Sequence, residues 1–169
     1  EVEDVGNFTN FTAGLTIAGA NVDFTNCKFA STVAVNDINS SFTNGSITGA
    51  LTIGAATTLV NNVAVGSTIA INAASATIQN SDLNGEVTIS STSAILSGNA
   101  ITATTNVAAT GASITGNTYT LSSSDTGITS ANAAGGYAAL SVTNNDFSSG
   151  DASAYTGIDL KDDFGGGTL

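Results

Sequence analysis

The sequence predicts an all-β protein, a single-stranded parallel β-helix (β-solenoid) whose coils repeat with a period of 18. Three observations support this fold class. A six-residue pattern returns at a constant interval, and its copies begin at Phe24, Phe42, Val60, Ile78, Leu96 and Ile114. A second apolar column has the same spacing, at Ile17, Val35, Ile53, Ile71, Ile89 and Val107. Apolar and polar residues alternate locally, as in Leu15-Thr16-Ile17, which indicates strands.

Each period is expected to form one coil with three short strands. Apolar residues fall at positions 1, 3, 10 and 15 of the period when Leu15 is position 1. A unit this small cannot bury its own apolar face, so the coils must stack to share a core. At about 1.5 to 3 kcal/mol for each buried apolar side chain, the columns offset much of the ordering entropy.

The chain divides into a terminal segment followed by regular coils. Residues 1–14 are expected to form an N-terminal capping coil or extension, because Phe11 lies one period before Phe29 but is preceded by three acidic residues. Terminal repeats of solenoids are commonly atypical in this way. Residues 15–122 are predicted to form six regular coils of equal length, which start at Leu15, Val33, Leu51, Ile69, Val87 and Thr105.

The regular spacing breaks after the sixth coil. Val142 follows Ile114 at an interval of 28 instead of 18, which predicts an inserted loop at residues 123–132. Insertions in a solenoid map to loops on one face, often the binding face, although a loop without a role is the alternative. Residues 133–169 are predicted to form C-terminal coils and a Gly-rich tail, with Leu160 taking the place of Val142 one coil later.

A polar column follows the third apolar residue of each period. Stacked asparagines can pass amide hydrogen bonds from coil to coil, and Asn and Gly both tolerate the left-handed backbone of tight turns. An Asn ladder is therefore predicted at Asn26, Asn44, Asn62 and Asn80. In the last regular coils this column becomes Gly98 and Gly116, and we expect the turn to shift by one residue to Asn99 and Asn117.

Composition excludes several function classes. The chain has no His, Arg or Pro, and its two lysines face thirteen acidic residues, for a net charge of −11. Such a chain lacks the clustered cations that nucleic-acid binding requires, and anionic membrane surfaces would repel it. No stretch approaches the roughly 20 apolar residues of a membrane span. The single Cys27 cannot form an intramolecular disulfide and is expected to be a buried thiol.

The chain begins at Glu1 instead of Met. This start is typical of a processed mature chain or an excised fragment. We therefore expect a secreted or cell-surface protein.

Segments such as Phe42-Thr43-Asn44-Gly45-Ser46-Ile47 and Val142-Thr143-Asn144-Asn145-Asp146-Phe147 resemble the repeat of right-handed parallel β-helix proteins. That group includes pectate lyases, polygalacturonases, phage tailspikes and bacterial surface adhesins. The resemblance implies a right-handed helix with an Asn-bearing turn between its second and third strands. A left-handed hexapeptide helix is the alternative, but it needs apolar residues every six positions, whereas the gaps here are seven, five and six.

Enzymes of this group resemble one another in using Arg, His and clustered Asp. This chain has neither Arg nor His, and its acidic residues between positions 15 and 122 fall at different places in the period: Asp23, Asp37, Asp82 and Glu86. The protein is therefore expected not to be an enzyme and to need no cofactor. Asp159, Asp162 and Asp163 could supply oxygen ligands for calcium, and a solvated acidic end is the alternative.

Three functions remain open at this stage. The first is an extracellular structural protein whose copies stack head to tail into a filament or surface structure, because a β-helix exposes an unpaired coil at each end. The second is a segment of a bacterial surface adhesin that binds glycan through Tyr119, Tyr137 or Tyr155. The third is ice binding by outward columns that contain Thr, such as Thr16 and Thr52, but alternate with Ala.

Overall fold

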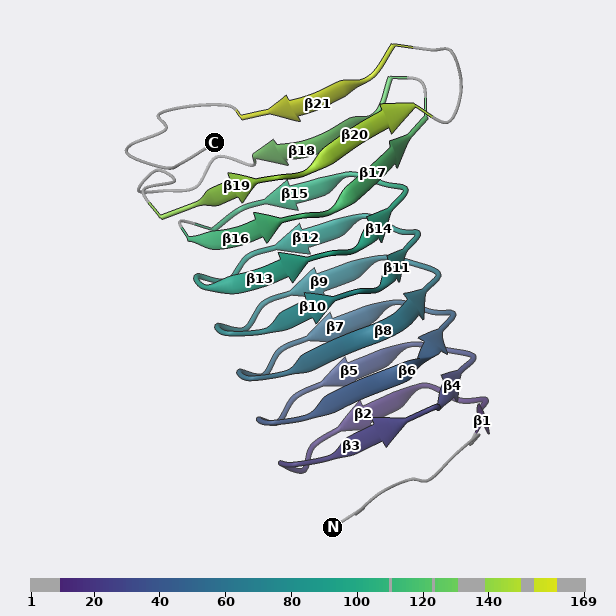
Figure 1. The fold of residues 1–169 in the computed structure, drawn as a ribbon. Coiled ribbons are helices and arrows are strands. Elements are labelled where there is room, and N and C mark those ends of the chain that lie inside the picture. Colours follow the sequence, from purple (N-terminus) through teal and green to yellow (C-terminus); the bar gives the residue numbers. More distant parts are fainter. Residues whose placement is uncertain (1–9, 110, 123, 131–138, 150–153, 161–169) are drawn as a thin grey trace.

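The computed structural model describes residues 10–109, 111–122, 124–130, 139–149 and 154–160 of the chain. Within these ranges the protein is a β-solenoid in which every strand pairing is parallel (Figure 1). The predicted all-β solenoid is therefore confirmed, and its regular coils keep the predicted period of 18. None of the described segments forms a helix that is long and apolar enough to cross a membrane.

The first strand of each coil belongs to an eight-stranded sheet. Its first six strands are in register one period apart, as in Leu15 opposite Val33 and Val33 opposite Leu51. In order along the rod, the strands are β2 (Leu15–Ile17), β5 (Val33–Val35), β7 (Leu51–Ile53), β9 (Ile69–Ile71), β12 (Val87–Ile89), β15 (Thr105–Val107), β18 (Thr126–Ser130) and β21 (Thr156–Asp159).

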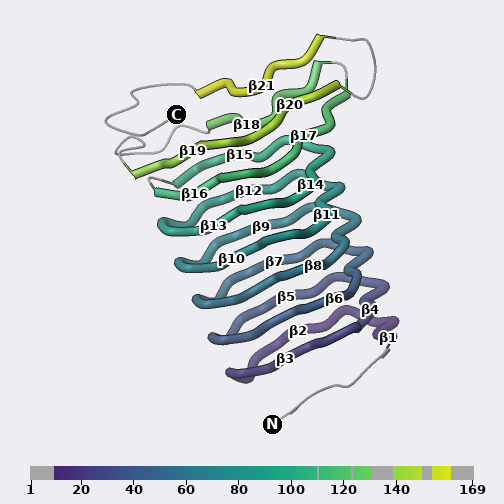
Figure 2. Tube along the Cα trace, viewed as in Figure 1, coloured from purple at the N-terminus to yellow at the C-terminus, as the bar shows by residue number. Residues whose placement is uncertain are grey.

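The second and third strands of the coils form a 13-stranded sheet. In two coils these strands form the long strands β6 and β8, which contain the bend residues Asn44 and Asn62, and elsewhere the bend separates the two strands (Figure 2). The strands are β1 (Asn10–Phe11), β3 (Asp23–Thr25), β4 (Lys28–Phe29), β6 (Ser41–Ile47), β8 (Leu59–Val65), β10 (Thr77–Gln79), β11 (Asp82–Leu83), β13 (Ala94–Ser97), β14 (Ala100–Ile101), β16 (Ala112–Thr115), β17 (Thr118–Leu121), β19 (Ser141–Thr143) and β20 (Asp146–Ser149).

The solenoid is right-handed. In Figure 1 the coils rise from the N-terminus at the bottom, and the nearer strands β3, β6, β8 and β10 run from left to right. The fainter, more distant strands β2, β5, β7 and β9 run back from right to left. A path that rises while turning in this sense is a right-handed helix, so the left-handed alternative is excluded.

Left-handed backbone occurs at one corner of all six regular coils and at a second corner of the first five. The bend between the second and third strands has a positive φ throughout, from 50° to 64°, at Asn26, Asn44, Asn62, Asn80, Gly98, Gly116 and Asn144. The turn between the first and second strands repeats the same conformation, at Asn21, Asn39, Thr57, Ser75 and Ser93. Asn and Gly adopt this conformation most readily, which explains the predicted Asn and Gly column at the bend.

The core is a bundle of inward columns at the four predicted positions. In the middle coils its side chains are fully buried, as shown by Leu51, Ile53, Val60 and Val65, each 0% exposed. Aromatic rings concentrate at the two ends of the rod. Phe11, Phe24, Phe29 and Phe42 pack together at the N-terminal end, and Tyr119 stacks on Phe147 near the C-terminal end.

The break in spacing is not one inserted loop at residues 123–132. Half of that range is β18 (Thr126–Ser130), a strand of the solenoid. Thr105 pairs with Ile128, an interval of 23, and Ile114 pairs with Val142, an interval of 28. Compared with a regular coil, the connection that leads into β18 is therefore five residues longer, and the connection from β18 to β19 is also five residues longer. The sequence spacing between repeats reports only the sum of the two.

The predicted place of Leu160 is also wrong. Leu160 was expected to repeat Val142 in the second strand of the last coil, but β21 is a first strand. Ile158 pairs with Ile128, an interval of 30, and so extends the first-strand column instead. The connection that leads to β21 is thus longer than in the regular coils.

Candidate functional site

The predicted exposed Asn ladder is present in part. Asn62 donates from Nδ2 to Oδ1 of Asn44 at 2.8 Å. Asn80 donates instead to Oδ1 of Asn61, at 3.0 Å, and Gln79 donates to the same oxygen at 3.2 Å. The ladder therefore crosses from the bend into the neighbouring outward column between the third and fourth coils.

A second ladder is buried inside the C-terminal coils. Asn99 donates from its backbone N and from Nδ2 to Oδ1 of Asn117, at 3.0 and 2.9 Å. Asn117 repeats both bonds to Oδ1 of Asn145, at 3.0 and 2.9 Å. Each Nδ2 also donates to a backbone carbonyl, that of Ile78 from Asn99 and that of Leu96 from Asn117. Since Asn99 and Asn117 are 2% and 1% exposed, this ladder satisfies polar groups in the core.

The buried ladder corrects the predicted shift of the turn. The left-handed bend stays at Gly98 and Gly116, with φ of 63° and 64°. Asn99 and Asn117 occupy the next position, which points inward. Cys27 and Val63 fill this inward position in earlier coils, where the core is apolar.

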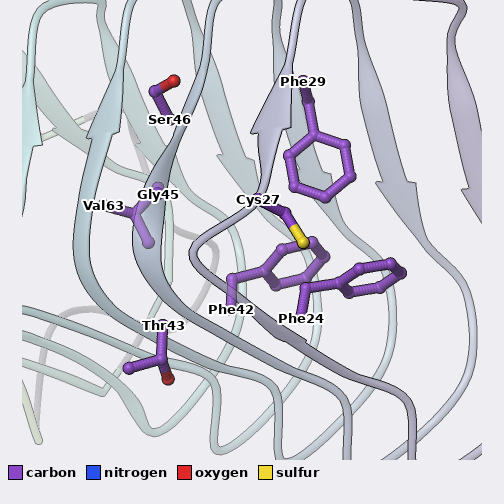
Figure 3. Close-up of a pocket in the computed structure, with 8 residues that line it drawn as sticks. All are labelled: Phe24, Cys27, Phe29, Phe42, Thr43, Gly45, Ser46 and Val63. Atoms are coloured by element: carbon purple, nitrogen blue, oxygen red, sulfur yellow. The ribbon is translucent and has the colours of Figure 1, made fainter. Parts of the chain in front are cut away.

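Cys27 is a buried thiol, as predicted. It is 2% exposed, and Sγ donates to the carbonyl oxygen of Thr25 at 3.5 Å. Figure 3 shows its sulfur pointing toward the rings of Phe24 and Phe42. The side chains here leave no room for a water molecule. Gly45 follows in the same column, where a Cβ would lie 2.3 Å from the carbonyl oxygen of Cys27. This region is core and not a ligand pocket.

Tyr119 is also a core residue. It is 0% exposed, and its hydroxyl lies 2.9 Å from Oγ1 of Thr105 across the core. Burial raises the pKa of Tyr119 above its ordinary value, and the hydrogen bond to Thr105 opposes that rise. Tyr119 is therefore wrong as a glycan-stacking residue. Tyr155 is 38% exposed and donates to the carbonyl oxygen of Phe147, whereas Tyr137 lies outside the described residues.

Of the three predicted calcium ligands, one lies within the described residues. Asp159 lies in β21, and Asp162 and Asp163 fall outside the described residues. Within the described ranges no group of three acidic or cysteine side chains is placed to hold a metal ion. The calcium site thus stays a prediction.

The N-terminal end of the rod, in the described part of the chain, presents apolar side chains. Within the described ranges, β2 pairs with β5 alone and β3 with β6 alone, so one edge of each strand faces away from the rod. Leu15 is half-buried here. A depression of 410 Å³ opens beside these strands, lined by Leu15, Thr16, Ile17, Ala18, Gly19, Ala20, Val22 and Phe24.

The C-terminal end also exposes apolar side chains. Among the described strands, β21 pairs only with β18, and β20 pairs only with β17. Ile158 in β21 is 38% exposed. Phe147 in β20 is half-buried and stacks on Tyr119, with ring centres 4.9 Å apart. Its ring lies over Gly127, where a Cβ would come within 2.5 Å of it.

One core column connects the two ends. Its inner members are at most 1% exposed: Val33, Leu51, Ile69, Val87, Thr105 and Ile128. Its end members are not sealed, since Leu15 is half-buried and Ile158 is 38% exposed. Among the described residues, the core therefore runs through the rod and becomes partly exposed at its two end members.

Comparison with protein families, curated proteins and solved structures finds no match to this chain. What the chain shares with right-handed β-helix proteins is the architecture of its coils, which the strand pairing shows. Nothing in these comparisons links the chain to the pectate lyases or to the adhesins.

Proposed function

We propose that the protein is a non-enzymatic structural subunit whose copies stack end to end into a filament or surface structure. The observation that carries this proposal is the exposure of one core column at both ends of the rod, at Leu15 and Ile158, while its inner members are buried. The proposal includes an extracellular or cell-surface location, where such a filament would project.

Stacking would complete what each end leaves unfinished. Edge strands with free N–H and C=O groups are templates for pairing, and proteins commonly block them with Pro or with charge. This chain has no Pro, and its two lysines are Lys28 and Lys161. A head-to-tail contact that does not close on itself generates a filament.

Energetic estimates indicate reversible assembly. Four partly exposed apolar side chains would become buried at each junction, namely Leu15, Ile158, Phe11 and Phe147. If about half of the roughly 1.5 to 3 kcal/mol for each side chain is gained, burial supplies about 3 to 6 kcal/mol. Each new backbone hydrogen bond adds about 0.5 to 1.5 kcal/mol. Because association costs about 4 to 15 kcal/mol, filaments should form above a threshold protein concentration.

Salt should promote assembly. Each copy carries a net charge of −11, so two copies repel each other at long range. Raising the ionic strength from about 0.01 M to 0.15 M shortens the screening length from about 30 Å to 8 Å. Repulsion between copies is then confined to groups near the junction, and the threshold concentration should fall.

The test is negative-stain electron microscopy and sedimentation of the purified chain over a range of protein and salt concentrations, with and without calcium. Eight first strands and one junction give eight steps of about 4.8 Å, so the axial repeat should be about 38 Å. Ile158→Asp should abolish filaments without unfolding the chain. Ile38→Asp is the matched control, because Ile38 is 48% exposed on a corner of the rod and not at an end. Isolated rods under every condition would refute the proposal and favour the adhesin hypothesis.

A further inference from the structure

The two ends of the described chain carry different parts of a coil. At the N-terminal end, β1 occupies a third-strand position, and Phe11 pairs with Phe29 of the following coil. At the C-terminal end, β21 occupies a first-strand position, and Ile158 pairs with Ile128 of the preceding coil. A first strand and a third strand are complementary parts of one coil.

We propose that β21 of one copy and β1 of the next copy belong to a single composite coil at each filament junction. This inference rests on the proposed end-to-end stacking and fixes its register. β20, which pairs with β17 alone among the described strands, would then pair with β1 of the next copy, and this places Asp146 opposite Asn10 and Phe147 opposite Phe11. β21, which pairs with β18 alone among the described strands, would pair with β2 of the next copy, and this places Ile158 opposite Leu15.

Aromatic packing favours this register. Within one copy, Phe11 stacks on Phe29 with ring centres 4.7 Å apart and planes at 8°. Tyr119 stacks on Phe147 at 4.9 Å and 18°. All four rings occupy the same column of the solenoid. In the composite coil, Phe147 meets Phe11 of the next copy, and the two pairs join into one continuous stack.

The same register gives the filament a direction. Asn10, Lys28 and Asp146 occupy one outward column, with Lys28 near the N-terminal end and Asp146 at the C-terminal end. The junction brings Asp146 to within two strand spacings, about 10 Å, of Lys28 of the next copy. Two N-terminal ends would both lack the first strand of the shared coil, and two C-terminal ends would both lack its third strand. Only head-to-tail assembly brings a first strand and a third strand together in this coil.

Disulfide cross-linking between differently labelled chains tests the register. Adjacent parallel strands place opposite Cα atoms about 4.8 Å apart, which suits a disulfide, whereas a separation of two strands does not. Asp146→Cys filaments should therefore cross-link to Asn10→Cys chains on mild oxidation. They should not cross-link to Lys28→Cys chains, because Lys28 lies one strand further into the rod. Native Cys27 is 2% exposed, and the unmodified chain serves as the background control.

The reactivity of the introduced thiols needs its own control. A chain with both Asn10→Cys and Lys28→Cys should form an intramolecular disulfide, because these residues are direct neighbours in the structure. Filaments that cross-link Asp146→Cys to Lys28→Cys as readily as to Asn10→Cys would overturn the composite coil and leave end-to-end assembly standing. If the unmodified chain forms no filaments at all, the proposed function itself fails.

Discussion

Replacing Asn117 by Ala would remove the central member of the buried ladder. The Asn117 side chain accepts two hydrogen bonds from Asn99 through Oδ1, at 3.0 and 2.9 Å. Through Nδ2 it donates to the carbonyl oxygen of Leu96 and to Oδ1 of Asn145, both at 2.9 Å. Ala can make none of these bonds. The backbone N–H of Asn117 still donates to Asn145, so the ladder would break toward Asn99 in particular.

The cost follows from the group left without a partner. Asn117→Ala would orphan the backbone N–H of Asn99, inside a core where Asn99 is 2% exposed, whereas the carbonyl oxygen of Leu96 keeps its place in the ladder between β13 and β16. An unsatisfied buried group costs about 1 to 3 kcal/mol, so we expect the free energy of unfolding to fall by about 1 to 3 kcal/mol.

Urea denaturation measures the total loss, and amide hydrogen exchange locates it. The N–H of Asn99 should exchange much faster in the variant. The N–H of Ser81 bonds to Asn99 Oδ1 at 3.0 Å and should keep more of its protection. Asn84→Ala is the control, since exposed Asn84 accepts one long hydrogen bond, 3.3 Å from Thr102, and should change stability by about 0.5 kcal/mol or less. Equal losses for the two variants, or an Asn99 amide that stays protected, would refute the reasoning.

Three further predictions concern single side chains. Burial holds the pKa of Tyr119 above its unfolded value of about 10, so the contribution of the neutral side chain to stability is full below about pH 10 and declines above it. Tyr119→Phe should therefore flatten the dependence of stability on pH in alkaline denaturation. The variant leaves the Thr105 hydroxyl without its hydrogen bond to Tyr119. Thr57 has a φ of 58°, which a β-branched residue rarely adopts. Thr57→Asn should therefore raise the melting temperature by relieving about 0.5 to 1 kcal/mol of backbone strain. An unchanged melting temperature would mean that the hydrogen bond from the Thr57 hydroxyl to Asn39 outweighs the strain. Ile53→Asp would bury an unpaired charge in a side-chain site that is 0% exposed and should prevent cooperative folding, and a variant that melts like the parent would show that this column is not core.

The coil length and the core columns could be predicted because one physical constraint sets both. Parallel stacking places residue 15 opposite 33 and residue 17 opposite 35, and apolar side chains must then coincide to share a core. Any drift would turn a buried side chain outward. The period of 18 can therefore be read from the spacing of apolar residues wherever successive coils have the same length. The hand of the solenoid came instead from the resemblance of its repeats to those of known right-handed helices.

The buried ladder was harder to predict because Asn suits two different positions. It tolerates the left-handed bend, where Asn44 and Asn62 lie, and it also satisfies itself inside the core when identical residues stack, as Asn99 and Asn117 do. The sequence did contain a signal. Gly98 and Gly116 keep the bend supplied with a permissive residue, so the Asn that follows each of them was free to serve another purpose.

The irregular coils escaped prediction because spacing constrains sums and not their parts. The interval from Ile114 to Val142 reveals that the chain is longer here but not that β18 divides the additional residues. The position of β18 among the additional residues depends on the burial of Ile128, which is 0% exposed and lies between Thr105 of the preceding coil and Ile158 of the following one.

The ends of the rod differ from its sides in one physical respect. The outward positions of the coils hold mostly small residues, with polar ones such as Thr16 and Thr52 alternating with Ala, and the large apolar side chains exposed there are Ile38 and Ile95 among the described residues. Leu15 and Ile158 are the end members of a column whose inner side chains are buried. All of those inner side chains are apolar except Thr105. Water next to Leu15 or Ile158 therefore contacts a surface that a neighbouring coil covers elsewhere in the column. Association through the ends therefore gains the same kind of burial that folds each coil. Association through the sides would gain little from exchanging solvent for a second polar surface, which is why we assign assembly to the ends.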